Sequence, residues 1–284
     1  MKEKIKLLFT SSRPVSWINT AYPFAAGYLV TGGNMNAQLV IGTLFFLIPY
    51  NLLMYGVNDV FDYESDMRNP RKGGIEGAIT PKKFHKLIIW TSGLLCVPFV
   101  LTLMLLGTLT SNIILLILIF FVVAYSINGL RFKEKPFLDS ITSSIHFVGP
   151  LVYALTLTNS LLMASVYVAA FFLWGIASHS FGAVQDIVPD KEANIGSIAT
   201  VLGARTTVRF SFICYSLAII LCATQNYYSF IVGLFGCLYL LNIWPYVYIS
   251  EDTSSLARAG WKRFIWINYI VGAVITICLI LHVT

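Results

Sequence analysis

Long apolar stretches, each near the length that crosses a lipid bilayer, recur along the chain and limit the folds that it can adopt. The run VIGTLFFLIPYNLLMYG, residues 40–56, contains no charged residue. Only 11% of all residues are charged, whereas soluble domains carry roughly 25%. Inside a bilayer a helix satisfies all of its own backbone hydrogen bonds. The sequence therefore predicts an all-α integral membrane protein.

The charged residues predict which way the helices cross the membrane. Connections such as TGGNMNAQ and TQNYYS carry no charge, while the alternate connections and the amino-terminal segment hold all 19 basic and all 13 acidic residues. By the positive-inside rule the charged side is cytoplasmic, with the amino terminus inside and the carboxyl terminus outside the inner membrane. The net charge of +6 then needs no nucleic acid to explain it. Nine transmembrane helices are expected, at 15–31, 38–58, 86–106, 111–128, 138–157, 162–184, 207–223, 228–249 and 263–282.

An acidic cluster follows the second of these spans, in the segment YGVNDVFDYESDMRNP. Asn58, Asp62 and Asp66 are spaced i, i+4, i+8, which places them on one stripe of a continuing helix, with Asp59 beside the stripe. Carboxylates four residues apart repel each other. They become favourable around Mg²⁺, which takes carboxylate and phosphate oxygens together. The alternative is that these acids are solvated charges that balance nearby lysines.

A second acidic cluster follows the sixth span, in GAVQDIVPDKEANIGSIATVLG. Asp186 and Asp190 are again four apart, but Pro189 disfavours a regular helix across them, so a helix end or a broken turn is expected. Two matching clusters on the cytoplasmic side favour a site for Mg²⁺ and a diphosphate. Basic candidates for the phosphates are Arg71, Lys72, Lys191, Arg131, Lys133 and Lys135.

The two motifs together resemble those of the UbiA-type membrane prenyltransferases. The pattern Asn-Asp-x-x-Asp-x-x-x-Asp follows the second span, and Asp-x-x-x-Asp follows the sixth. The resemblance implies one domain over residues 1–284, a nine-helix bundle with a central cavity open to the cytoplasmic side, and binding of Mg²⁺ and an isoprenyl diphosphate. The implied catalytic and metal-binding residues are Asn58, Asp62, Asp66, Asp186 and Asp190. The implied diphosphate-binding residues are Arg13, Arg71, Tyr125 and Lys133. The family often carries a further Asp in the second motif, where this chain offers Glu192 or Asn194.

Within that family, three stretches are most similar to lycopene elongases, which add dimethylallyl units to the ends of lycopene on the route to fifty-carbon carotenoids. They are SSRPVSWINTAYPFAAGYL, NDVFDYESDMRNPRKGGIEGA and GAVQDIVPDKEANIGSIATVLGAR. The resemblance implies an isoprenyl diphosphate, a carotenoid acceptor and membrane lipids as partners, with a lycopene cyclase acting downstream. An aromatic, quinone-precursor or other lipid acceptor is the alternative within the family. A transporter or a non-catalytic assembly subunit are alternatives from other classes.

Two histidines lie within the expected spans, and Asp139 lies at the boundary where one of them starts. His146 and His179 are interpreted as buried neutral histidines bonded to a neighbouring carbonyl group, with a proton-accepting role as the alternative. Asp139 is interpreted as a cap that binds free amides at the start of the helix expected at 138–157.

Overall fold

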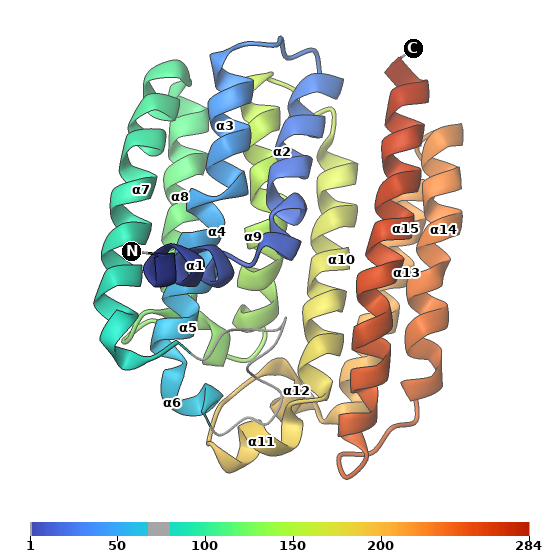
Figure 1. Ribbon diagram of the computed structural model, residues 1–284. Coiled ribbons are helices and arrows are strands. Elements are labelled where there is room, and N and C mark those ends of the chain that lie inside the picture. Colours follow the sequence, from blue (N-terminus) through green and yellow to red (C-terminus); the bar gives the residue numbers. More distant parts are fainter. Residues whose placement is uncertain (1, 68–79, 284) are drawn as a thin grey trace. The chain divides into compact units, whose positions relative to one another are not determined.

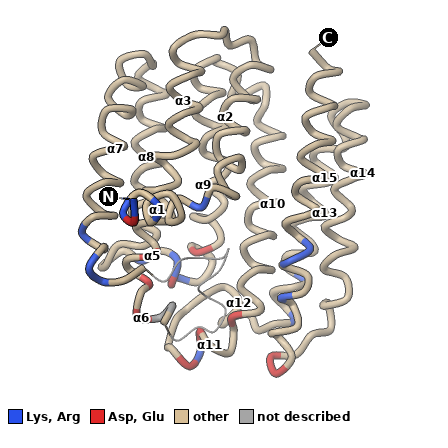
Figure 2. The backbone as a smooth tube through the Cα atoms, viewed as in Figure 1, with Lys and Arg blue, Asp and Glu red and all other residues tan. Residues whose placement is uncertain are grey.

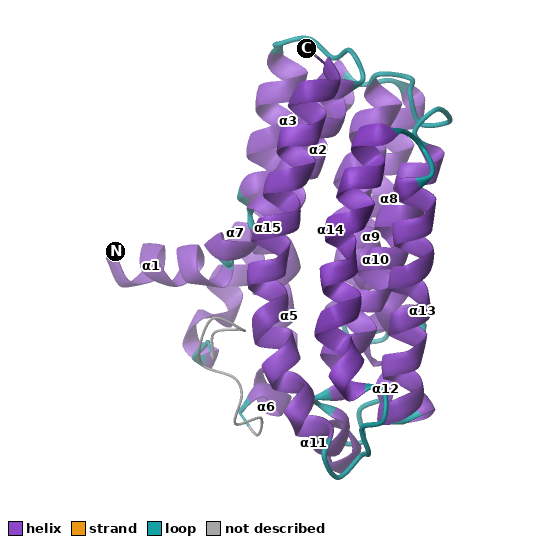
Figure 3. Cartoon of the chain, turned by 90° about the vertical axis from the view of Figure 1, so that its right-hand side faces the viewer, coloured by secondary structure: helices purple, strands orange, loops and turns teal. Residues whose placement is uncertain are grey.

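The structure, a computed structural model, describes residues 2–67 and 80–283, and every regular element within these residues is helical (Figure 1, Figure 3). This confirms the predicted all-α class. The longer helices are α1 Lys2–Ser11, α2 Ile18–Val30, α3 Ala37–Leu47, α7 His85–Leu106, α8 Leu109–Ser126, α9 Leu138–Leu157, α10 Ser165–Val184, α13 Ala204–Ala223, α14 Tyr227–Ile243 and α15 Ala257–Val283. The shorter elements are η1 Pro14–Ser16, α4 Pro49–Asn51, η2 Leu52–Gly56, α5 Val57–Phe61, α6 Tyr63–Asp66, η3 Lys82–Phe84, η4 Phe132–Glu134, α11 Ile187–Glu192, α12 Ile198–Leu202, η5 Trp244–Tyr246 and η6 Ser254–Leu256.

Eight segments of the described chain are long and apolar enough to cross a membrane. Each overlaps one of the ranges expected from the sequence. The ninth expected range, 15–31, contains α2, which has only 13 residues and is shorter than the roughly 17–25 that span a bilayer. The count of nine spans is therefore not confirmed. The eight segments are Ala37–Phe61, Lys82–Leu106, Leu109–Ser126, Leu138–Leu157, Ser165–Val184, Ala204–Ala223, Tyr227–Tyr246 and Ser254–Val283.

The chain divides into two compact units, of which the first comprises residues 1–132 and 145–162. Within it α2 packs on α3, α3 on α7 and α7 on α8. An aromatic cluster fills the centre: the ring of the fully buried Phe24 lies 5.1 Å from that of Phe46 and 5.9 Å from that of Tyr153 in α9. Burial of such large rings supplies most of the packing at this point.

Between α3 and α5 the helix breaks once and then changes from α- to π-helical geometry and back. Pro49 lacks the amide donor that would continue α3, so carbonyl groups at the end of α3 need other partners. Asn51, which is fully buried, supplies them: its Nδ2 donates to the carbonyl oxygens of Phe46 at 2.7 Å and Leu47 at 3.1 Å. A π-helical turn, η2, then leads into α5. Turns of this kind are frequent at functional sites.

The second unit comprises residues 133–144 and 163–284. In it α10 packs on α13, α13 on α14, and α15 on both α14 and α10. Stacked aromatic rings fill the space between these helices: the ring centres of Tyr215 and Tyr239 lie 5.2 Å apart, and those of Trp174 and Phe264 lie 5.8 Å apart. The start of α9 belongs to this unit and the rest of that helix to the first.

Charged residues gather at one end of the helices in each unit, considered separately (Figure 2). In the first unit they lie around α1, α5, α6 and the start of α7, and in the second around α11, η6 and the neighbouring parts of α13 and α15. No Asp, Glu, Lys or Arg occurs within α3, α8 or α10. The uncharged helices and charged ends fit a protein that crosses the membrane several times.

Candidate metal and diphosphate site

The first acidic motif lies where α5 ends. Asn58 and Asp59 are in α5, and Asp62 is the C-cap residue of that helix. The next helix, α6, begins at Tyr63. The prediction of a helix that continues through Asp66 is therefore wrong, because the helix is interrupted at Asp62. Asn58 and Asp62 remain one turn apart and Asp62 is only 6% exposed. The side chain of Asp66 lies outside the described part of the structure.

Arg13 and Asp59 form an ion pair beside this motif. Nη2 of Arg13 lies 2.7 Å from Oδ1 of Asp59, whose side chain is fully buried. The guanidinium also lies 4.3 Å from the ring centre of Tyr55, a cation–π contact. The sequence placed Asp59 to one side of the metal stripe, and the structure places it against a cation. Its contribution here is to hold Arg13, which the resemblance assigns to the diphosphate.

A second arginine lies against the other acid of the motif. Nη2 of Arg131 is 3.7 Å from Oδ1 of Asp62, and its Nη1 donates to the carbonyl oxygen of Phe61 at 3.3 Å. On the same side, Ser126 Oγ donates to Oδ1 of Asn58 at 3.1 Å, which orients the amide. The motif thus lies between two arginines, in an environment where carboxylate and phosphate oxygens both find cationic partners.

Both arginines have left-handed backbone conformations. The φ angle is 50° at Arg13 and 38° at Arg131. Residues other than glycine rarely adopt φ values in this region, and such strain clusters at functional sites. Of the five non-glycine residues with positive φ in the described chain, these two are the cations that contact the motif.

The second acidic motif forms a short helix of the second unit. Asp186 immediately precedes α11, and its carbonyl oxygen accepts from the amide of Asp190 at 2.8 Å. The expectation of a helix end is confirmed for Asp186. The expected break at Pro189 does not occur, because this proline is in the first turn of α11, where a missing donor costs nothing.

Lys191 pairs with an acid outside the motif. Its Nζ lies 2.6 Å from Oε2 of Glu251, with both side chains nearly half exposed. The ammonium group keeps two further N–H donors for other partners.

Of the other predicted diphosphate residues, two lie in α8 and η4 and two lie outside the described chain. The ring of Tyr125 packs edge-on against that of His146, with their centres 5.0 Å apart. Lys133 lies in η4. Arg71 and Lys72 lie outside the described residues.

The donor chemistry of both motifs suits Mg²⁺. In the described chain, no three His, Cys, Asp or Glu side chains lie close enough together to enclose a metal ion by themselves. Mg²⁺ does not need such an enclosure, because it binds through one or two carboxylates and completes its shell with water and substrate phosphates. Asn58, Asp62, Asp186 and Asp190 offer oxygen donors only. Each motif, considered by itself, thus has ligand chemistry that suits Mg²⁺.

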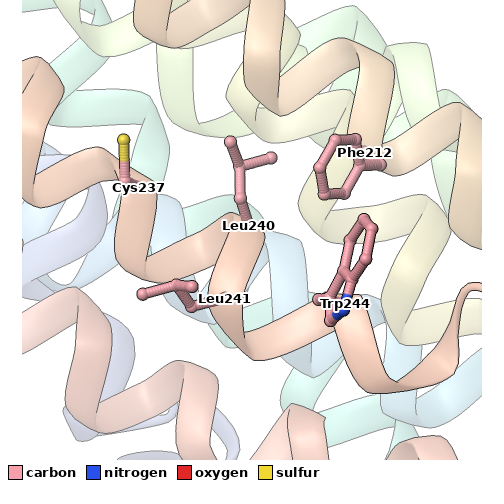
Figure 4. Close-up of a pocket in the computed structure, with 5 residues that line it drawn as sticks. All are labelled: Phe212, Cys237, Leu240, Leu241 and Trp244. Carbon is pink, nitrogen blue, oxygen red and sulfur yellow. The ribbon is translucent and has the colours of Figure 1, made fainter.

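A shallow groove on the second unit has a different character. The groove has a volume of about 220 Å³. It is lined by Phe212 of α13 and by Cys237, Leu240, Leu241 and Trp244 (Figure 4). Leu241 and Trp244 are 69% and 59% exposed. Its wholly apolar lining within a candidate span is what a lipid-facing surface requires, and it offers nothing to a diphosphate.

These features define a multi-pass helical membrane protein with one acidic motif next to two arginines and a second acidic motif at a short helix. The chain belongs to the UbiA prenyltransferase family, which it matches over residues 20–268.

Two curated proteins and one solved structure show what this chain is similar to. A lycopene elongase/hydratase of Corynebacterium glutamicum is 49% identical over 282 residues, covering 99% of this chain and 98% of that protein. A C(50) beta-cyclic carotenoids biosynthesis protein of a Dietzia species is 47% identical over 95% of this chain and 63% of its own length. Among solved structures, a UbiA homolog from Archaeoglobus fulgidus bound to DMAPP and Mg²⁺ has a TM-score of 0.66, at 17% identity and with 93% and 98% of the two chains covered. That structure supports the fold.

Proposed function

We propose that this protein is a Mg²⁺-dependent lycopene elongase that transfers dimethylallyl groups from dimethylallyl diphosphate to the ends of lycopene. The observation that carries the proposal is the 49% identity to a lycopene elongase/hydratase over nearly the full length of both chains. A partial match could reflect a shared fold alone. Similarity at this level over the full length supports a shared substrate class as well.

Each acidic motif supplies ligands in this proposal. The proposed catalytic and metal-binding residues are Asn58, Asp62, Asp66, Asp186 and Asp190. When bound, Mg²⁺ neutralises the diphosphate and stabilises the charge that develops on the leaving oxygen. Asn58 is already oriented by Ser126, so its Oδ1 is held in place before any ligand arrives. Pre-oriented donors of this kind lose little free energy to reorganisation during the reaction.

The cationic residues bind the diphosphate. Arg13 and Arg131, each anchored on a motif carboxylate, can donate further N–H groups to phosphate oxygens. The remaining proposed diphosphate residues are Arg71, Lys72, Tyr125, Lys133 and Lys191. An arginine held by a carboxylate keeps its fork geometry and loses little conformational entropy on binding.

The membrane topology is part of the proposal. We place α2 as the first of nine spans in a single domain over residues 1–284, with the amino terminus in the cytoplasm and the carboxyl terminus outside the inner membrane. The reaction occurs in an apolar cavity open to the cytoplasmic side, which keeps water from the allylic cation. A lipid-dissolved carotenoid enters from the bilayer, and a lycopene cyclase can act on the product.

Expression in a lycopene-producing host, followed by mass analysis of the pigments, tests this function. Wild-type protein should yield forty-five- and fifty-carbon carotenoids, and Asp62→Asn should abolish them while protein still accumulates in the membrane. Asp252→Asn, the same change at an exposed acid, is the control and should retain activity. Unextended lycopene together with a prenylated aromatic or quinone product would identify a different acceptor and contradict the proposal.

A further inference from the structure

A buried carboxylate and a histidine meet in the second unit. Asp139, in the first turn of α9, is fully buried, and its Oδ2 lies 3.7 Å from Nε2 of His179 in α10. The His179 side chain is 21% exposed. Both residues lie in candidate membrane spans. Ionisable groups within such spans are costly and mark functional sites unless their partners explain them.

Backbone contacts fix the Asp139 carboxylate in one orientation. Its Oδ1 accepts from the amide of Ser140 at 2.7 Å, and its Oδ2 accepts from the amide of Ile198, at the start of α12, at 2.8 Å. Asp139 therefore binds a free amide at the start of its own helix, as expected, although it is the second residue of α9, and it also binds the first amide of α12. The carboxylate that faces His179 cannot turn away without losing these two bonds.

His179 lies near the carboxyl end of α10, which leads to the second acidic motif. It precedes Asp186 by seven residues, and α10 runs through to Val184. At 1.5 Å per residue, the helix rises about 7.5 Å from His179 to its end, and Asp186 follows in the turn that leads to α11. The interpretation of His179 as bonded to a carbonyl group is replaced by its pairing with a carboxylate. Its other ring nitrogen, Nδ1, makes no hydrogen bond in the described structure.

We propose that His179 is the catalytic base that ends the reaction, and that Asp139 is its positioning residue. The inference rests on the proposed function. After the allylic cation has joined the acceptor, the positive charge lies on a carbon of the acceptor. The C–H bond next to that carbon breaks, its electron pair forms the new C=C bond, and the proton moves to Nδ1 of His179. Asp139 stabilises the imidazolium, which then passes its proton to water.

His179→Ala tests the base directly, with purified protein, lycopene and dimethylallyl diphosphate. Product with new alkene ends should fall at least about 100-fold, the usual contribution of a positioned base. The remaining product should shift toward alcohol ends, because water captures the cation that no base has quenched. Added imidazole should restore alkene ends, which a purely structural role of His179 would not allow. His282→Ala, at the exposed end of α15, is the matched control and should change none of these.

Asp139→Asn tests the positioning role. We expect kcat for alkene formation to fall with little change in KM, and the alcohol share to rise as in His179→Ala. An unchanged rate and product ratio in His179→Ala would overturn the inference, as would a loss of all product that imidazole does not restore. If the wild type makes extended carotenoids, the proposed function holds after either of these outcomes for His179→Ala. A wild type that never extends lycopene would overturn the proposed function, and the inference with it.

Discussion

The ion pair between Arg13 and Asp59 should stabilise the first unit substantially. Removing one partner of a buried pair costs about 3–5 kcal/mol, and we take the lower end, about 3 kcal/mol, because the Arg13 side chain is 18% exposed. That value corresponds to about a 100-fold change in the ratio of folded to unfolded protein. Arg13→Gln and Asp59→Asn should each cost about this much. The double variant should cost little more than either, because the second change removes a charge that has already lost its partner.

Equilibrium unfolding in detergent micelles with increasing SDS, followed by tryptophan fluorescence, measures these free energies. Trp17 is a suitable reporter, because its Nε1 donates to the carbonyl oxygen of Ser12, next to Arg13. The half-exposed pair of Lys191 and Glu251 provides the control, and its coupling energy should stay below about 1 kcal/mol. Additive losses for Arg13 and Asp59, within about 0.5 kcal/mol, would refute the reasoning.

Three further outcomes follow from the site and the packing. Excess EDTA should stop turnover in isolated membranes and added Mg²⁺ should restore it; undiminished turnover in EDTA would contradict a metal role. Arg131→Gln should raise KM for the isoprenyl diphosphate about tenfold in steady-state assays, the equivalent of one lost charge-assisted hydrogen bond; an unchanged KM would place Arg131 outside the diphosphate site. Gly175→Val should destabilise by about 1–3 kcal/mol in SDS unfolding, because a Cβ would meet the Ser144 side chain. Gly272→Val, where nothing lies within 4 Å of such a Cβ, should not, and equal losses in both variants would argue against the clash.

Most of the helical layout could be predicted from the sequence, because the bilayer thickness fixes the length of an apolar helix. The helix expected at 111–128 is α8, Leu109–Ser126, whose start is fixed by a capping box of Thr108 and Ser111. The exception is the range 15–31. There Pro14 begins a short 3₁₀ turn and the regular helix starts only at Ile18. Hydropathy does not register a change of backbone geometry, so it overestimated this helix.

The sequence could predict which residues belong to the candidate site, but it could not predict which of them contact each other. Spacing placed Asn58 and Asp62 one turn apart, which local geometry alone decides. The pairing of Arg13 with Asp59 joins residues 46 positions apart, and only the packed fold decides it. The same holds for Asp139 and His179. Their one signal in the sequence was the presence of ionisable groups in otherwise apolar runs.

The π-helical turn of residues 52–56 precedes the acidic motif. The direction of the Asn58 side chain therefore depends on the number of residues in this turn as well as on their identity. A residue in an α-helix turns the chain by about 100°. Deleting one residue from this turn would rotate Asn58 away from Ser126, while conservative replacements there would leave its direction unchanged. Tolerance to conservative replacement and intolerance to a one-residue deletion should therefore coexist at Leu52, Leu53 and Met54.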